Sequence, residues 1–229
     1  MSDQVANKYL RLFLDRHTSV TYNKGDILIF QGEAPKHAFV VKDGVVKAYN
    51  LSVNGDEKPV AFYKEDSIFP GPWVYGATPS SLYYYEVSSN TATIYTVKKE
   101  ELADFIKKRP ELLYNEFKKY ISEQLGLSIR LNALQHSRAS DKLIYTLHYL
   151  ALNNGQLVKP KVYEIKLSLT HQDFANLTGL TRETAATELN RLKKNGVIHY
   201  SNGSNYILYL DKLTLMINDQ FIADMPKNL

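Results

Sequence analysis

The sequence predicts an α+β protein: an N-terminal β-roll, one long helix, and a C-terminal unit of short helices with a hairpin. Three observations carry this prediction. Short β-type runs fill most of the first 110 residues, an unbroken helical pattern follows, and two short helices joined at a glycine occupy the last third. We therefore expect three parts, residues 1–110, 111–137 and 138–229.

Composition narrows the class of protein. The 229 residues are 44% hydrophobic and 23% charged, as in ordinary globular proteins. The chain has no cysteine, which excludes disulfides, thiolate zinc sites, Cys-ligated iron–sulfur clusters and Cys nucleophiles. The net charge of +4 permits nucleic-acid binding without requiring it. Because no apolar run is long enough for a membrane span and the N-terminus does not resemble a signal peptide, we expect a cytoplasmic protein.

The first part begins with a predicted helix over residues 3–17. From Val20 onward, β-type runs such as HAFVVKDGVVKAYNL and KPVAFYKEDSIF alternate with turn residues, and KDG and NGD are typical of hairpin turns. Many short strands with frequent turns indicate a small barrel or roll. A short helix over residues 100–109 should end at Pro110.

The second part is a long helix over residues 111–137. Its apolar residues recur at alternating spacings of four and three, which is the heptad seam of a coiled coil. A helix of roughly 26 residues is about 40 Å long, more than a small roll can cover, so a second copy of the chain is the simplest partner. A helix buried inside one subunit would show the same pattern. The predicted dimer seam consists of Leu113, Phe117, Tyr120, Gln124, Leu127, Leu131 and Leu134.

The third part starts with a helix that we expect Ser140 to cap and Asn153-Asn154-Gly155 to end. A loop and a strand are predicted over residues 156–167. The tail from Asp211 is predicted to be helical.

The stretch from Leu169 to Tyr200 holds two short helices. Thr170 and Asp173 have the spacing of a capping box, Gly179 breaks the first helix, and Thr181 can cap the second. A hairpin with its turn around residues 202–203 follows. This order is that of a winged helix-turn-helix, whose second helix enters the major groove of DNA by its N-terminal end.

Several residues of this unit are candidates for contact with double-stranded DNA. Arg182 can donate two hydrogen bonds to guanine, and Glu183 can accept one from cytosine. Both could instead be ordinary solvated residues of a first helical turn. The full predicted set is Thr170, His171, Gln172, Thr181, Arg182, Glu183, Thr184, Thr187, Arg191, Lys193, Asn202 and Ser204.

The stretch LTHQDFANLTGLTRETAATELNRLKKNGVI resembles the helix-turn-helix signature of the Crp/Fnr family of bacterial transcription regulators. The layout is similar along the whole chain, and Gly32, Gly44 and Gly71 match the turn glycines of the family's roll. The resemblance implies a homodimer on two-fold symmetric DNA, with Arg182 and Glu183 reading bases and Thr170 and Gln172 at phosphates. It also implies contact with RNA polymerase through a loop at residues 153–161. A third base-reading position, often Arg in the family, is Thr187 in this chain, so we expect a half-site other than the usual one.

The sensor part departs from the family pattern. Cyclic-nucleotide binders of the family carry a Gly-Glu-Leu turn followed by Arg-Ser-Ala, whereas Pro72 stands at the Glu position and Tyr83 and Tyr84 stand near Arg-Ser. No arginine occurs between Arg16 and Arg109. Without that bidentate phosphate donor, a cyclic nucleotide should bind poorly.

The chain is therefore expected to respond to another small-molecule effector or to bind DNA without one, with a cyclic nucleotide in a non-standard pocket as the alternative. Aromatic walls suit an effector with a flat or apolar body, although tyrosines at alternate strand positions are also ordinary core residues. The candidate effector pocket consists of Phe69, Trp73, Tyr75, Tyr83, Tyr84, Tyr85, Leu127 and Ser128.

A different class would use the roll as the cavity of a cupin-like enzyme or ligand-binding protein. Such a cavity normally carries a His/Glu metal cluster at short spacing. Residues 1–109 contain neither H-x-H nor E-x-x-H, and nothing in the sequence arranges His17 and His37 as haem ligands. We therefore expect neither an enzyme nor a metal or cofactor site.

Overall fold

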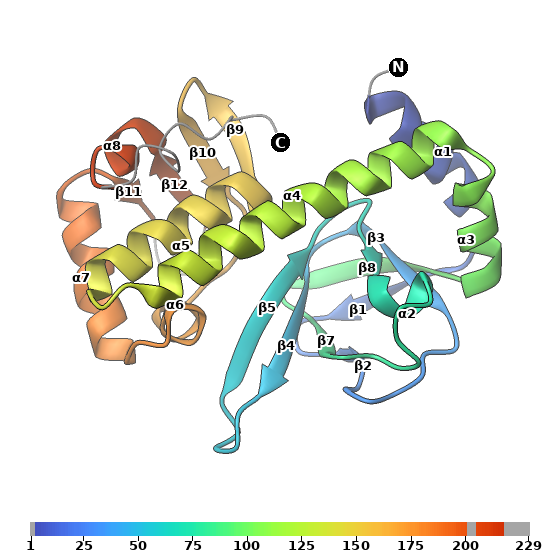
Figure 1. Ribbon diagram of the computed structural model, residues 1–229, viewed down its shortest axis with the longest axis horizontal. Helices are drawn as coiled ribbons and strands as arrows, with labels where there is room; N and C mark the ends of the chain where they lie inside the picture. Colours follow the sequence, from blue (N-terminus) through green and yellow to red (C-terminus); the bar gives the residue numbers. More distant parts are fainter. Residues whose placement is uncertain (1–2, 201–204, 218–229) are drawn as a thin grey trace. The chain divides into compact units, whose positions relative to one another are not determined.

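The computed structural model of the chain describes residues 3–200 and 205–217 (Figure 1). The chain divides into two compact units, Met1–Lys119 and Tyr120–Leu229, and the long helix α4 (Pro110–Gln135) contributes to both. The predicted α+β class, with a sheet-rich first unit and a helix-turn-helix in the second, is confirmed. None of the described helices is both long and apolar enough to cross a bilayer.

The first unit is a roll of two four-stranded antiparallel sheets (Figure 1). Helices α1 (Asp3–Leu14), α2 (Gly71–Val74) and α3 (Lys99–Lys107) complete the unit. In sheet order, the first sheet holds β1 (Ser19–Asn23), β8 (Thr91–Val97), β3 (Ala38–Asp43) and β6 (Ile68–Phe69). The second holds β2 (Ile27–Ile29), β7 (Tyr84–Val87), β4 (Val46–Leu51) and β5 (Glu57–Tyr63).

Successive side chains of β3 and β8 point to opposite faces of the first sheet, so the sheet has a hydrophobic core on each face. Val41 and Ile94 point between the two sheets and belong to the interior cluster, which also contains Phe69 and Tyr85. The neighbouring residues on the other face pack against α1, α2, α3 and the start of α4, through side chains such as Leu10, Trp73, Leu102 and Leu112. A strand buried on both faces explains why these runs read as almost continuously apolar.

The two predicted hairpin turns of the roll differ in outcome. NGD does join a hairpin, because β4 and β5 are antiparallel neighbours. The prediction for KDG was wrong, because β3 and β4 belong to different sheets and the chain crosses between them there. Gly44 in this crossover has φ +90°, and a Cβ atom would lie 2.5 Å from the carbonyl oxygen of Thr91. Both the conformation and the close approach require glycine.

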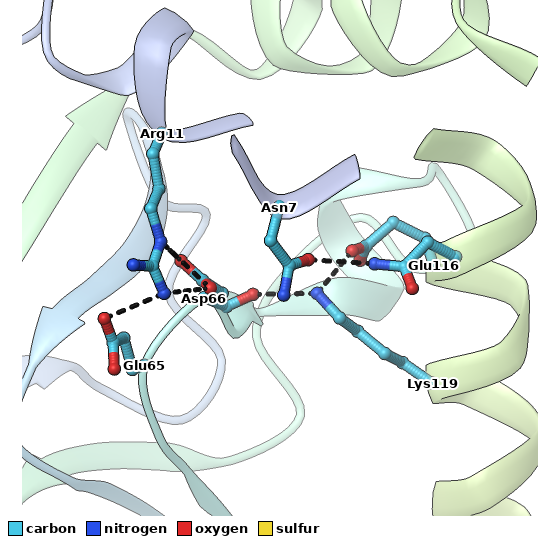
Figure 2. Close-up of polar contacts among 7 residues, drawn as sticks. Asn7, Arg11, Glu65, Asp66, Glu116 and Lys119 are labelled. Carbon is cyan, nitrogen blue, oxygen red and sulfur yellow. Dashed lines mark hydrogen bonds and ion pairs between the residues drawn. The ribbon is translucent and has the colours of Figure 1, made fainter. Parts of the chain in front are cut away.

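Polar side chains tie α1, the β5–β6 turn and the start of α4 together within the first unit (Figure 2). The guanidinium of Arg11 donates to both carboxylate oxygens of Asp66, at 3.0 and 2.7 Å, and also pairs with Glu65 at 2.9 Å. Lys119 donates to the main-chain oxygen of Asp66 at 3.1 Å. The buried Asn115 donates to Asn7 at 3.0 Å. We call this set the turn network.

The described residues of the second unit form a four-stranded sheet in the order β11-β12-β10-β9 and four helices besides the end of α4. Its elements are α5 (Ala139–Asn154), β9 (Gly155–Lys159), β10 (Val162–Ile165), α6 (His171–Thr178), α7 (Arg182–Lys194), β11 (Ile198–His199), β12 (Tyr206–Tyr209) and α8 (Leu210–Thr214).

Three details of this unit differ from the sequence predictions. The residue at the N-cap of α5 is Arg138, and Ser140 lies inside the helix, where its hydroxyl bonds Asp141. The predicted loop before β10 is in fact strand β9, which pairs with β10. The tail helix ends at Thr214, and residues 218–229 lie outside the described part.

Candidate nucleic-acid interface

The start of α6 is closed by a reciprocal capping box, as predicted. The hydroxyl of Thr170 accepts from the backbone N–H of Asp173 at 3.1 Å, and the Asp173 carboxylate accepts from the backbone N–H of Thr170 at 2.7 Å. At the other end Gly179 takes the left-handed conformation, φ +67°, which stops the helix. These local contacts give α6 its length of two turns.

The start of α7 is closed by Thr181, whose hydroxyl accepts from the backbone N–H of Thr184 at 3.2 Å. Ala185, Leu189 and Leu192 are fully buried on one face of α7. That packing fixes which residues of the first turns face outward. The interface therefore begins at a helix end whose position is set by a cap and a buried face.

The predicted base-reading residues occupy this outward face. Arg182, Glu183 and Thr187 are exposed, and Thr184 is half-buried with its hydroxyl 2.9 Å from that of Thr181. Within residues 3–200 and 205–217, the side chain of neither Arg182 nor Glu183 forms a hydrogen bond or an ion pair. Both side chains are therefore available to a partner with hydrogen-bonding groups of its own.

The side chains predicted to contact phosphates do have partners within the protein. Gln172 donates to Asn176 at 3.0 Å, and Arg191 pairs with Glu188 one turn earlier at 2.8 Å. The ammonium of Lys193 donates to the main-chain oxygen of Tyr200 at 2.8 Å. Asn202 and Ser204 lie outside the described residues.

Tyr200, which the sequence did not single out, links these groups. Its hydroxyl lies 3.4 Å from His171 and 3.4 Å from Asn190, so it contacts both α6 and α7. Burial raises the pKa of this phenol, which keeps the hydroxyl protonated. No local pattern could have found it, because its partners lie 10 and 29 residues away in sequence.

The predicted dimer seam forms an exposed apolar stripe along α4. Its apolar members have exposed fractions from 39% at Leu127 to 61% at Leu131, and Gln124 is also exposed. On the other faces of the same helix, Ile129 and Ala133 are buried. Single exposed leucines are common on protein surfaces, but a row of them at heptad spacing is not.

The aromatic residues of the candidate effector pocket are spread over different parts of the first unit. Phe69 and Tyr85 belong to the interior cluster, where their rings stack at 5.2 Å, and Tyr83 packs against that cluster. Trp73 belongs to the core between the first sheet and helices α1, α2 and α3. Tyr84 stacks on Tyr49 at 5.3 Å, and Tyr75 is exposed. Leu127 and Ser128 lie in the second unit. Across the described residues, no three His, Asp or Glu side chains gather into a possible metal site.

Comparisons with known proteins match the first and the second unit to different domain families. The cyclic nucleotide-binding domain profile matches residues 19–109, and the Crp-like helix-turn-helix domain profile matches residues 141–216. A global nitrogen regulator of Synechococcus elongatus is 25% identical over 177 residues, which cover 77% of this chain and 79% of the relative. A fumarate and nitrate reduction regulatory protein of Vibrio cholerae is 25% identical over 194 residues, covering 84% and 75%.

Solved structures share the fold over nearly the whole chain. FixK2 of Bradyrhizobium japonicum has a TM-score of 0.71 at 18% identity and covers 89% of this chain and 98% of its own. A mutant of CooA from Carboxydothermus hydrogenoformans has a TM-score of 0.69 at 23% identity, with 89% of each chain covered. The two profile matches, the regulator relatives and the shared fold together assign the chain to one family. It belongs to the Crp/Fnr family of DNA-binding transcription regulators.

Proposed function

We propose that the protein is a homodimeric regulator that reads a two-fold symmetric DNA site through the N-terminal end of α7. The observation that carries this proposal is that the side chains of Arg182 and Glu183 are exposed at a capped helix start and have no partner among the described residues. Arg182 would donate to guanine O6 and N7, and Glu183 would accept from cytosine N4. Thr187, one turn further on, offers only a short hydroxyl and a methyl group where an arginine would reach further.

The phosphate contacts would come from groups around this end. Thr170 and Gln172 stand at the capped start of α6, where backbone N–H groups and the helix dipole favour an anion. Arg191 and Lys193 lie in the last turn of α7 and would add affinity without reading sequence. The wing residues Asn202 and Ser204 are proposed as further contacts.

Dimerisation would bury the exposed stripe of α4 against its copy. The heptad spacing and the exposure of Leu127 and Leu131 support this arrangement, since burying each leucine is favourable by about 1.5–3 kcal/mol. A two-fold axis between the helices would present two copies of α7 to successive major grooves.

DNA binding would not depend on a cyclic nucleotide. Pro72, Tyr83 and Tyr84 stand where the family's nucleotide binders carry their polar anchors. The interior cluster also contains a stack of rings that contact each other, with Phe39, Tyr63 and Tyr85 each packed on Phe69 or its neighbours at 5.2–5.6 Å. Large side chains that fill one another's space suit a constitutive fold or an effector of another chemical class.

For RNA polymerase, we propose the β9–β10 hairpin as the contact surface. Leu157 and Val158 are exposed on β9, at 53% and 45%, beside Lys159. Among the described strands β9 pairs with β10 alone, so it lies at the edge of its sheet there.

The experiment that tests this function changes the stripe on α4. Leu127→Glu with Leu131→Glu should convert the dimer into a monomer by light scattering, because charges at heptad positions cannot be buried. The affinity for a DNA duplex selected with the wild-type protein should fall at least a hundred-fold, since one protomer then reaches only one half-site. The matched control is Leu51→Glu with Leu215→Glu, which changes exposed leucines outside α4 and outside the proposed contact surfaces. If the α4 variant stays dimeric, the assignment of the dimer interface to this stripe is wrong.

A further inference from the structure

We propose that Tyr200 is a positioning residue of the DNA-binding surface, which holds groups of α6 and α7 in place before DNA binds. This inference rests on the proposed function, because it assigns a role within the same surface. Tyr200 follows β11 directly and precedes the connection to β12. Its hydroxyl contacts His171 and Asn190, and its ring and its carbonyl both contact Lys193.

The hydroxyl joins the two helices. Its oxygen lies 3.4 Å from Oδ1 of Asn190 and 3.4 Å from Nε2 of His171. An amide oxygen can only accept, so the single hydroxyl proton goes to Asn190. The imidazole must then donate from Nε2 to the phenol oxygen. Tyr200 therefore holds His171, the first residue of α6, with a proton on Nε2 that points at the phenol oxygen.

The carbonyl and the ring hold a cation of α7. Nζ of Lys193 lies 2.8 Å from the carbonyl oxygen and 4.4 Å from the ring centroid of Tyr200. The ring itself packs on that of the buried Tyr206, with centroids 4.8 Å apart and the ring planes tilted by 34°. The hydroxyl of Tyr206 donates to the carbonyl oxygen of Leu169 at 2.8 Å, next to the capping residue of α6. A continuous series of contacts thus runs from the core of the unit to an exposed ammonium group.

This arrangement lowers the cost of binding a phosphate backbone. A free lysine loses rotamer entropy when it is fixed at a phosphate, whereas Lys193 is already ordered in the free protein. The imidazole of His171 is likewise oriented before DNA arrives. Because phosphates carry no sequence information, Tyr200 should raise affinity for every duplex by the same factor.

The test uses full-length protein and two DNA probes, a duplex selected in vitro with the wild-type protein and a scrambled duplex of equal composition. Tyr200→Phe keeps the ring and removes the hydroxyl. We expect the dissociation constants for both duplexes to rise roughly three- to ten-fold by fluorescence anisotropy, with their ratio unchanged. In a His171→Ala background the same change should cost less than about two-fold, because the hydroxyl acts through His171. Tyr209→Phe on β12 is the matched control and should leave both constants unchanged.

Three results would overturn the inference: unchanged binding by Tyr200→Phe, an equal loss with and without His171, or a loss on the selected duplex alone. If Tyr200→Phe lowers the unfolding midpoint, Asn190→Ala removes the acceptor from an exposed position and should give the same small, His171-dependent loss on both duplexes. An equal loss for Asn190→Ala with and without His171 would also contradict the inference. Failure of the wild-type protein to prefer its selected duplex would instead refute the proposed function.

Discussion

The two units use charged side chains in opposite ways. In the turn network of the first unit, Arg11 pairs with the carboxylate of Asp66, and Lys119 donates to the main-chain oxygen of the same residue. The Asp66 side chain is only 10% exposed. At the start of α7, Arg182 and Glu183 are exposed and unpaired within the described part of the chain. Paired charges in the roll hold three segments in place. Unpaired charges on a capped helix remain available for a partner.

The last turn of α7 lies between these extremes. Arg191 and Lys193 are held, but by an adjacent glutamate and by a main-chain oxygen at the surface. Such contacts orient a cation and are weak enough to be replaced by a phosphate. The comparison therefore predicts that changes in the roll alter stability, whereas changes on α7 alter DNA binding.

The largest expected effect concerns the interior of the second unit, where burial lowers the pKa of His148 to about 4. The unfolded chain, with a pKa near 6.5, binds a proton that the folded chain excludes. Stability is therefore highest above pH 6.5 and falls as the pH drops towards 4, by about 3 kcal/mol. Denaturant unfolding between pH 7 and 4 should show this slope in the wild type and a shallower one in His148→Leu. The exposed His199 is the control, and His199→Gln should keep the wild-type slope.

The next effect concerns the turn network. Asp66→Asn keeps the shape of the side chain and tolerates its positive φ of 64°, but leaves Arg11 without a carboxylate partner at this position. We expect a loss of about 2 kcal/mol in unfolding free energy, measured in urea, with DNA affinity unchanged within about two-fold. An Asp66→Asn protein with native stability and weakened DNA binding would contradict the expectation that the turn network serves stability.

On α7, Arg182→Ala should leave the unfolding free energy within about 0.5 kcal/mol of the wild type, because the side chain is exposed and has no partner in the part of the chain that the structure describes. Its affinity for the selected duplex should fall about ten-fold, or about 1.4 kcal/mol, with little change on scrambled DNA. An equal loss on both duplexes would make Arg182 a phosphate contact.

The smallest effect is expected for the exposed ion pair between Lys58 and Asp56, 3.6 Å apart with both side chains about half exposed. Lys58→Ala should change the unfolding free energy by less than about 0.5 kcal/mol. A loss as large as that of Asp66→Asn would show that burial does not decide which charges hold the roll together.

The helix-turn-helix could be predicted almost residue by residue because its signals are local. Thr170 and Asp173 cap each other over three residues, and Gly179 and Thr181 set the break within four. The capping box, the left-handed glycine and the second cap all stand where the sequence indicated.

Features that depend on distant partners could not be predicted in the same way. KDG has the composition of a hairpin turn, yet pairing with β8 and β7 takes β3 and β4 into different sheets. β9 begins at Gly155, the residue expected only to end the preceding helix, and Pro160 follows its last residue, so the segment between them reads as a loop. The role of Tyr200 depends on contacts with α6 and α7. The pair Glu188 and Arg191, by contrast, has helical i,i+3 spacing and could have been found.

The most direct measurement of the central claim is in vitro selection of duplexes from a random library by the wild-type protein and by Arg182→Ala. We expect two inverted half-sites whose centres lie about one helical turn, roughly 34 Å, apart. The variant should lose its preference at one base pair in each half-site and keep the spacing. Recovery of a single unsymmetric site, or the same preference at every base pair with Arg182→Ala, would contradict the claim that two copies of α7 read the DNA.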